Sequence, residues 1–294
     1  MNKLSIIQNN HAIEFGFGKV KYLYGNNYEM KHFLSRTLKK HFFGVDQTEY
    51  DREKDCLTEI KIDDKPLDTK KWKMYEISDN YDVDTELKLG SKAILLKYIE
   101  LSLVNIEYDE TVQTINILLN DLCKILEEKI NQLDSKFDFL VEFPELTTKF
   151  LVKNMNLGMM EEGYKINGYN LTIEELLWVQ VKMAIFIATS NDLFNYIFLI
   201  DTPILYERIK TLIECHELPN LHFLVAINEP LDTDVDNVIS FESKSLDFAN
   251  EVDLYNDILL ELEVTLTLDE LKEKLHNYIC KEEDPVLKHV VKLL

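Results

Sequence analysis

The sequence is poor in residues that interrupt regular structure and in clustered cysteines. Its 294 residues include only 8 glycines and 6 prolines, which argues against long disordered linkers. No Cys-x-x-Cys pair is present, and wide spacing of this kind predicts reduced core thiols in a cytoplasmic protein rather than a structural zinc site. The four cysteines are Cys56, Cys123, Cys215 and Cys280.

Long hydrophobic runs and positive charge are also scarce. No stretch approaches the roughly 20 apolar residues that span a bilayer, and residues 1–10 lack the apolar core of a secretion signal. We therefore expect a cytoplasmic protein without a membrane anchor. The chain has 53 acidic and 32 basic residues, which gives a net charge of −21. Taken alone, this charge argues against a nucleic-acid binder, unless basic residues gather on one face or bound cations neutralise carboxylates.

The hydrophobic content of 46% is enough for a folded core, and its periodicity indicates an α/β protein. The runs 196–200 and 221–227 are short and continuously apolar, as in strands that are covered on both faces. A helical pattern over 205–213 joins them, which predicts a parallel strand–helix–strand crossover. Residues 20–24 predict a further strand, and a turn leads from it into a helix over 30–43.

Long helical periods dominate the region between these predicted strands. The longest covers 111–133 and has an apolar stripe that requires a partner helix. Another helix is expected over 93–103, and a helical pattern with a break in the middle continues over 138–156. Two Thr-x-x-Glu sequences predict capping boxes at Thr172 and Thr267, each ahead of a helix.

The expected architecture is an α/β head that is interrupted by an all-helical insertion, the leg. Residues 1–92 and 192–245 would form the head. Residues 93–191 would form the leg. Residues 246–294 would form a helical C-terminal extension.

The strand–turn–helix near the start occupies the place of a phosphate-binding loop, and residues 24–31 read Tyr-Gly-Asn-Asn-Tyr-Glu-Met-Lys. A working loop uses glycines to bring backbone amides to the phosphate, followed by a Lys-Ser/Thr pair for charge and magnesium. Here one glycine is left, Glu29 adds a repulsive charge, and the pair is missing. We therefore expect no nucleotide turnover. Asp201 stands where phosphate-loop ATPases hold magnesium, but the following Pro203 favours a helix-capping role for it.

An acidic run, residues 107–110 with the sequence Glu-Tyr-Asp-Glu, lies between two predicted helices. Side-chain oxygens and free backbone carbonyls would be available together there, and calcium takes six to eight oxygen ligands. The alternative is that Asp109 or Thr111 caps the long helix, while the glutamates favour its positive end. No hydrolase arrangement is evident, and the pair Cys215-His216 has no second cluster beside it in the sequence.

Two segments together resemble the CRISPR-associated adaptation protein of type II-A systems, the Csn-two family. One is the Ile-Glu-Tyr-Asp-Glu sequence at 106–110, which leads into a long helix. The other is the strand–helix–strand at 196–230, which closes with Glu-Pro. The resemblance covers about residues 95–245 and the degenerate strand–loop–helix near the start. In its last part, 246–294, the chain differs from shorter members and is similar to a longer branch of the family.

The resemblance implies that the head is a degenerate version of a phosphate-loop (P-loop) ATPase domain that carries the helical leg. It also implies a protein that is not an enzyme. Members of the family form a tetrameric ring, bind Ca²⁺ at the acidic run between head and leg, and thread linear double-stranded DNA from its ends. They act in antiviral defence, beside the CRISPR integrase and the RNA-guided effector nuclease, during spacer acquisition. The motif carries three Ca²⁺ ligands over to this chain, namely Glu107, Asp109 and Glu110.

Binding of DNA by such an acidic chain requires a basic lining that faces the duplex. Contacts to phosphates would position the protein without reading bases. Two other functions stay open, a P-loop-like NTPase or magnesium-dependent nuclease that uses Asp201, and a protein-interaction scaffold that binds no DNA. We expect the lining to consist of two groups, Arg36, Lys39 and Lys40 on the head helix and Lys149, Lys153 and Lys165 near the leg.

Overall fold

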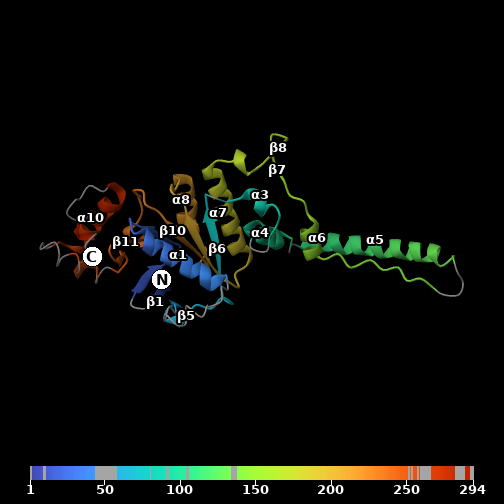
Figure 1. Ribbon diagram of the computed structural model, residues 1–294, viewed down its shortest axis with the longest axis horizontal. Coiled ribbons are helices and arrows are strands. Elements are labelled where there is room, and N and C mark those ends of the chain that lie inside the picture. The colour runs from blue at the N-terminus through green and yellow to red at the C-terminus, as the bar shows by residue number, and fades with distance from the viewer. Residues whose placement is uncertain are drawn as a thin grey trace. The chain divides into compact units, whose positions relative to one another are not determined.

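The computed structural model divides the chain into two compact units (Figure 1), which we describe separately. The head unit consists of Met1–Tyr81 and Ile173–Leu294, and the leg unit consists of Asp82–Thr172. Within the described residues, no helix is long and apolar enough to cross a membrane. The structure describes residues 2–8, 11–43, 58–79, 81–90, 93–103, 106–133, 138–250, 266–281 and 289–291, and five residues of 252–258.

A six-stranded sheet forms the centre of the head unit. All neighbouring strands are parallel except β12, which is antiparallel to β11. Strands β3, β9 and β10 are buried along nearly their whole length, as their continuous apolar runs predicted. In spatial order the strands are β12 (Ser245–Asp247), β11 (Val238–Phe241), β3 (Val20–Tyr24), β10 (Leu221–Ala226), β9 (Asn195–Asp201) and β6 (Trp72–Ser78).

A smaller antiparallel sheet and helix α1 (Tyr28–Phe42) cover one face of the large sheet. Leu4 and Phe15 of the small sheet share one hydrophobic core with Leu34 and Leu38 of α1. Apolar side chains from the facing side of the large sheet complete this core. In spatial order the strands of the small sheet are β2 (His11–Phe17), β1 (Asn2–Gln8), β4 (Thr58–Ile62) and β5 (Lys65–Pro66).

Helices α7 (Ile173–Ser190) and α8 (Glu207–Cys215) pack on the opposite face of the large sheet (Figure 1). The side chain of Gln180 in α7 is fully buried. Its Nε2 donates to the Ser78 carbonyl at 2.9 Å, and its Oε1 accepts from the Ser78 N–H at 3.3 Å. This double hydrogen bond ties α7 to the end of β6, and the leg unit is inserted in the chain between these two elements.

Helix α10 (Leu268–Lys281) belongs to the head unit and not to a separate C-terminal extension. It begins with the predicted capping box. The Thr267 N–H donates to the Glu270 carboxylate at 2.7 Å, and the Glu270 N–H donates to the Thr267 hydroxyl at 3.3 Å. The helix lies beside the short 3₁₀-helix η2 (Val235–Asn237), which precedes β11.

The observed leg unit differs in its bounds from the leg that the sequence indicated over 93–191. Helix α7 is part of the head unit because Leu177, Val181 and Ile187 are buried in the layer over the large sheet. The leg unit also begins earlier, at Asp82, ahead of the short helix α3. The apolar pattern of α7 does not show whether the helix packs on the sheet or in the neighbouring helical region, so the sequence alone could not assign it to one unit.

The leg unit is built around α5 (Ile106–Ile130), a helix of 25 residues. Its apolar pattern predicted a start at 111, but the helix already begins at Ile106, so the acidic run 107–110 is helical. The other elements of the unit are α3 (Val83–Glu86), α4 (Ile94–Ser102), α6 (Thr148–Asn154), β7 (Met159–Glu161), β8 (Tyr164–Ile166) and the 3₁₀-helix η1 (Gly168–Asn170).

An extended segment, residues 138–147, returns along α5 where the sequence predicted a helix (Figure 1). We call this segment the strap. The Asn116 amide donates to the Leu146 carbonyl at 3.0 Å and accepts from the Leu146 N–H at 2.8 Å. Asn131 bonds both backbone groups of Phe139 in the same way. The predicted helix is wrong over the strap because asparagine side chains take backbone groups that a helix would pair.

Candidate functional sites

The strand–loop–helix near the N-terminus lies where β3 ends at one edge of the large sheet. Gly25 follows Tyr24 with a φ of +106°, a conformation that favours glycine. A Cβ on Gly25 would lie only 2.5 Å from the Phe241 carbonyl oxygen, so a larger residue would push the loop away from β11. Asn27 then caps α1, since its side chain accepts from the Met30 N–H at 3.0 Å.

Backbone amides that would cradle a phosphate at this loop are already bonded within the protein. The Asn26 N–H donates to the Glu242 carboxylate at 3.3 Å, and the Asn27 N–H donates to the Phe241 carbonyl at 2.9 Å. The Asn27 side chain also donates to the Glu242 carbonyl at 2.5 Å. A carboxylate of the chain itself therefore faces the loop where a working phosphate loop would face its anion.

Lys31 is a buried cation in the first turns of α1. Its Nζ donates to the Ile227 carbonyl at 2.8 Å and to Asn228 Oδ1 at 2.5 Å. Burial lowers its pKa to about 8, although Glu242 and Asp201 attract the proton and oppose this shift. The sequence alone indicates no role for this lysine, because its partners are distant in the chain.

Asp201 is the last residue of β9 and is exposed. The helix cap expected for it is wrong, because α8 begins only at Glu207 and has no side-chain hydrogen bond at its N-cap. The Thr202 hydroxyl instead donates to the Ile204 carbonyl at 2.9 Å, which holds the chain in a turn before the helix. Asp201 is thus an accessible carboxylate at the strand ends, on the same edge of the sheet as Lys31.

The acidic run lies on the first turns of α5 and not between two helices. Asp109 and Glu110 are exposed, and the side chain of Glu107 lies outside the described residues. The Asp109 carboxylate accepts from the Gln113 side chain at 3.0 Å, and the Glu110 carbonyl accepts from the Thr114 hydroxyl at 2.8 Å. Within the described residues, neither carboxylate belongs to a group of three metal-ligating side chains. The three-residue Ca²⁺ site stays a prediction.

The basic side chains expected in the leg are exposed. Lys149 and Lys153 lie four residues apart on α6, so they share one side of that helix. Lys165 is exposed on β8, in the hairpin with β7. The structure therefore brings Lys149 and Lys153 together and presents all three to solvent, as contacts to DNA phosphates would require. Their binding to DNA stays a prediction.

The basic side chains on α1 are less alike. Arg36 is exposed, whereas Lys39 is half-buried and forms an ion pair with Glu76 of β6 at 2.6 Å. Lys40 is also half-buried. Arg36 is thus the most accessible cation of the three, and Lys39 already has a carboxylate partner within the head unit.

Helix α5 presents an apolar stripe to solvent. None of its described side chains is buried. A cluster of large exposed apolar residues is typical of an interaction surface rather than of a free monomer surface. Four of them leave more than half of their surface exposed, namely Ile117, Leu118, Leu122 and Ile125. Outside the strap, the described part of the leg unit offers this stripe no partner helix.

A buried ion pair in the head unit was not predicted from the sequence. Lys21 of β3 is fully buried, and its Nζ lies 2.5 Å from the Asp247 carboxylate and 2.8 Å from the Asp236 carbonyl that accepts from it. Asp247 also accepts from the Gly16 N–H at 2.7 Å, which links the two sheets. Burial lowers the pKa of Lys21, against the attraction of Asp247. A lysine inside the apolar run 20–24 was the available signal in the sequence.

The described cysteines do not lie in the core as the sequence predicted. Cys215 is exposed, Cys123 and Cys280 are half-buried, and Cys56 lies outside the described residues. His216 is buried beside its exposed neighbour Cys215, so these two side chains lie in different environments.

No family model matches the sequence, and no curated protein matches it. Among solved structures, the fold is similar to that in the crystal structure of Stu0660 of Streptococcus thermophilus. The alignment covers 100% of this chain and 93% of that chain, with a TM-score of 0.74 and 14% sequence identity. At this identity the match shows the fold, and it confirms the predicted α/β class with additional helical parts.

Proposed function

We propose that the protein is a non-catalytic, Ca²⁺-dependent, ring-forming protein that binds ends of double-stranded DNA during CRISPR spacer acquisition. The observation that carries this proposal is the interruption of a parallel α/β sheet unit by a leg whose long helix begins with an acidic run. The resemblance to the Csn-two family implies this arrangement. The structural match covers 100% of this chain, so it supports the proposal for the head and the leg alike. Its place of action would be the cytoplasm, beside the CRISPR integrase and the RNA-guided effector nuclease.

The hydrogen bonding of the degenerate loop supports a role without nucleotide turnover. The Asn27 N–H donates to the last carbonyl of β11, and the Asn26 N–H donates to the carboxylate of the next residue, Glu242. The Lys31 ammonium donates to two oxygen atoms in the residues just after β10. Binding of a nucleotide phosphate would have to break these contacts and displace the Glu242 carboxylate. Magnesium-dependent ATP or GTP turnover that is lost in Asp201→Ala would replace this proposal with the NTPase alternative.

The apolar stripe of α5 supports assembly into a homotetramer. A stable interface of an obligate oligomer commonly buries about 2,000 Å² or more, and an exposed 25-residue helix can contribute much of this area. Native mass spectrometry should give a tetramer, and Leu118→Glu with Leu122→Glu should reduce the mass to that of smaller species. Exposed Asp121→Ala with Glu128→Ala on the same helix is the control. A tetramer that survives the first pair would place the interface elsewhere.

Calcium gives the assembly a way to reduce its negative charge. Four chains carry 4 × −21 = −84 charges before any cation binds, so the average field repels DNA. Isothermal titration with CaCl₂ should show binding that Asp109→Asn with Glu110→Gln weakens. The control Asp121→Asn with Glu128→Gln removes the same charge from the same helix. If both pairs leave Ca²⁺ binding unchanged, or if EDTA changes neither native mass nor melting temperature, the Ca²⁺ site is wrong.

Threading of a ring predicts that DNA topology controls binding. The protein with Ca²⁺ should bind linear duplexes of any sequence and should fail to load on covalently closed circles. Phosphate contacts release counterions, so log K should fall with log salt with a slope of about −0.9 per phosphate that is neutralised. Equal binding to linear and closed DNA, or binding that does not depend on salt, would contradict the proposal.

The leg lysines provide a sharper test of the same proposal. Lys149→Glu with Lys153→Glu should weaken binding to all duplex sequences alike and reduce the salt slope by about 2 for each chain of the tetramer whose pair contacts the duplex. Lys65→Glu with Lys70→Glu, two exposed head lysines, makes the same charge change and is the matched control. If the control pair has the same effect, the loss reflects net charge and not a lining at α6.

A further inference from the structure

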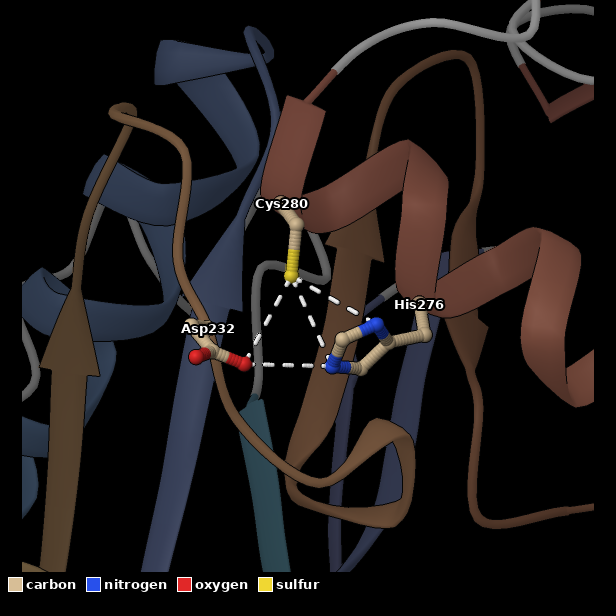
Figure 2. Close-up of side chains that lie close together, drawn as sticks. All are labelled: Asp232, His276 and Cys280. Carbon is tan, nitrogen blue, oxygen red and sulfur yellow. Dashed lines mark hydrogen bonds and ion pairs between the residues drawn. The ribbon is translucent and has the colours of Figure 1, made fainter.

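Three side chains of the types that bind transition metals meet at the surface of the head unit (Figure 2). Within the described residues, Asp232, His276 and Cys280 form a group whose ligand atoms all lie within 4.8 Å of one another. His276 and Cys280 lie four residues apart on α10, and Asp232 lies on the segment between β10 and η2. In the sequence, the His-x-x-x-Cys spacing was the available signal of this group.

The separations of the three ligand atoms are close to those in a tetrahedral zinc site. Asp232 Oδ1 lies 3.2 Å from His276 Nε2 and 3.8 Å from Cys280 Sγ, and Sγ lies 3.5 Å from Nε2. Ordinary zinc bond lengths at tetrahedral angles give about 3.3, 3.5 and 3.6 Å for the same three pairs. The three ligand atoms are thus spaced nearly as a zinc site requires, before the direction of the His276 lone pair is considered.

The remaining adjustment is a rotation of the His276 ring. Sγ of Cys280 lies 3.6 Å from Nδ1, nearly as far as from Nε2, so it lies out of the ring plane and not on the line of the Nε2 lone pair. An ion bound to Nε2 lies along the lone pair of that atom, further toward Asp232 Oδ1. Turning the imidazole about its Cβ–Cγ bond changes the direction of this lone pair, and the His276 side chain is 44% exposed, so the ring is not enclosed by the core.

The backbone around the group is fixed before any ion binds. The Leu231 N–H donates to the Ile279 carbonyl at 2.7 Å, which holds the segment that carries Asp232 against α10. Lys272 of α10 and Asp236 of η2 form a second link at 3.5 Å. The Asp232 side chain is 85% exposed, so the fourth corner of the tetrahedron opens to water. The group therefore combines a rigid base with an accessible coordination position.

We propose that Asp232, His276 and Cys280 bind one Zn²⁺ ion per chain, with a water molecule as the fourth ligand. The Cys280 thiol releases its proton to solvent, and its Sγ together with neutral Nε2 and the carboxylate oxygen donates electron pairs to the ion. The thiolate and imidazole select a zinc-type cation, because Ca²⁺ and Mg²⁺ take oxygen ligands. The ion fastens α10 to the segment after β10. This site is independent of the acidic run on α5.

The test is titration of the full chain, freed of metal with a chelator, with ZnSO₄ by isothermal calorimetry. The expected result is one Zn²⁺ per chain, with a higher melting temperature in the loaded protein. Loss of even a partner of a metal ligand weakens affinity by about 10- to 100-fold, so Cys280→Ser and His276→Gln should each weaken it by more than about a hundredfold. Cys215→Ser, an exposed cysteine beside a histidine, is the matched control and should bind like the wild type.

A second measurement keeps the test decisive if a variant unfolds. Co²⁺ added to the wild-type chain should give the absorption of a tetrahedral thiolate complex, and ZnSO₄ should remove it by displacement. Absence of this spectrum, or wild-type Zn²⁺ affinity in Cys280→Ser with an unchanged circular dichroism spectrum, overturns the proposal. Asp109→Asn with Glu110→Gln should leave Zn²⁺ binding unchanged, so a failure of the Ca²⁺ site and a failure of the zinc site give different results.

Discussion

Helices α7 and α5 both carry apolar side chains along their length, but the chain uses them differently. Eight of the 18 residues of α7 are buried, whereas no described side chain of the 25-residue α5 is buried. The apolar pattern of α7 is explained by the fold of one chain, since the large sheet covers it. The strap lies along α5, but the stripe of α5 still leaves Ile117, Leu118 and Leu122 more than half exposed. The difference separates a helix that is covered by the core of its own unit from a helix that keeps its apolar side chains exposed.

Polar side chains are also more buried in the head unit than in the leg unit, as the following pairs show. The head unit buries charges and pairs them, as with Lys21 and Asp247. The leg unit uses partly exposed asparagines, Asn116 and Asn131, to hold a strap on a helix. Removing a partner should therefore have a large effect on the head and a small, local effect on the leg.

The largest effect is expected for Asp247→Ala in the head. It leaves the fully buried Lys21 without its carboxylate, and breaking a buried pair in this way costs about 3–5 kcal/mol in the free energy of unfolding. Asp121→Ala in the leg removes the exposed partner of Lys124, 3.4 Å away, and should cost less than about 1 kcal/mol. Urea unfolding of both variants measures the contrast. Similar losses would mean that Lys21 becomes hydrated and that the two units do not differ in this respect.

An acid-dependent effect should come next and should be confined to the head, because the leg unit contains no histidine. Burial lowers the pKa values of His216 and His222, and His222 lies with Nδ1 2.6 Å from the Gly18 carbonyl. Below pH about 6.5 the unfolded chain takes up protons that the folded chain does not. The free energy of unfolding should therefore fall as the pH decreases. Each of the two histidines contributes at most about 1.4 kcal/mol per pH unit, until the pH reaches the lowered pKa of that histidine in the folded chain.

Urea unfolding between pH 8 and pH 5 measures this slope. His222→Gln should reduce it, while the exposed His32→Gln on α1 should leave it unchanged. Amide hydrogen exchange in peptides of the leg unit should show no loss of protection between pH 8 and pH 5, once the intrinsic pH dependence of exchange has been subtracted. A slope that persists in His222→Gln would assign the acid sensitivity to His216 or to carboxylates.

The smallest effect is expected when the strap is released in the leg. Asn116→Ala removes two hydrogen bonds to Leu146 and should cost about 1–2 kcal/mol locally. Amide exchange in residues 138–147 should accelerate, while exchange in the head unit stays the same. Asn120→Ala, an exposed asparagine one turn further along α5, is the control. Unchanged exchange of the strap in Asn116→Ala would show that other contacts hold it.

The sequence predicts this molecule well where the signal is local. The runs 196–200 and 221–227 predict buried strands, and Thr267 predicts a helix cap, because composition within a few residues determines those features. The bounds of α5 and α7 were harder, since an apolar helix pattern does not say which layer will cover it. The six-stranded sheet follows from its strands only after their spatial order is known.

The features that the sequence did not predict depend on contacts between residues that are distant in the chain. The strap is extended because Asn116, far from it in sequence, bonds its backbone. Lys31 and Glu242 face the degenerate loop from different elements, and Asp232 meets His276 only after α10 packs on the head unit. The predicted Ca²⁺ ligands and basic lining came from a motif and a resemblance, so they depend on the binding experiments.

The double hydrogen bond between Gln180 and Ser78 has an evolutionary consequence. It closes the head at the two chain junctions of the inserted unit, so the register of the large sheet does not depend on what lies between them. Insertions and deletions within the leg can then accumulate without selection against a misfolded head. Lineages with this architecture are free to vary the size of the inserted unit while they inherit the same sheet.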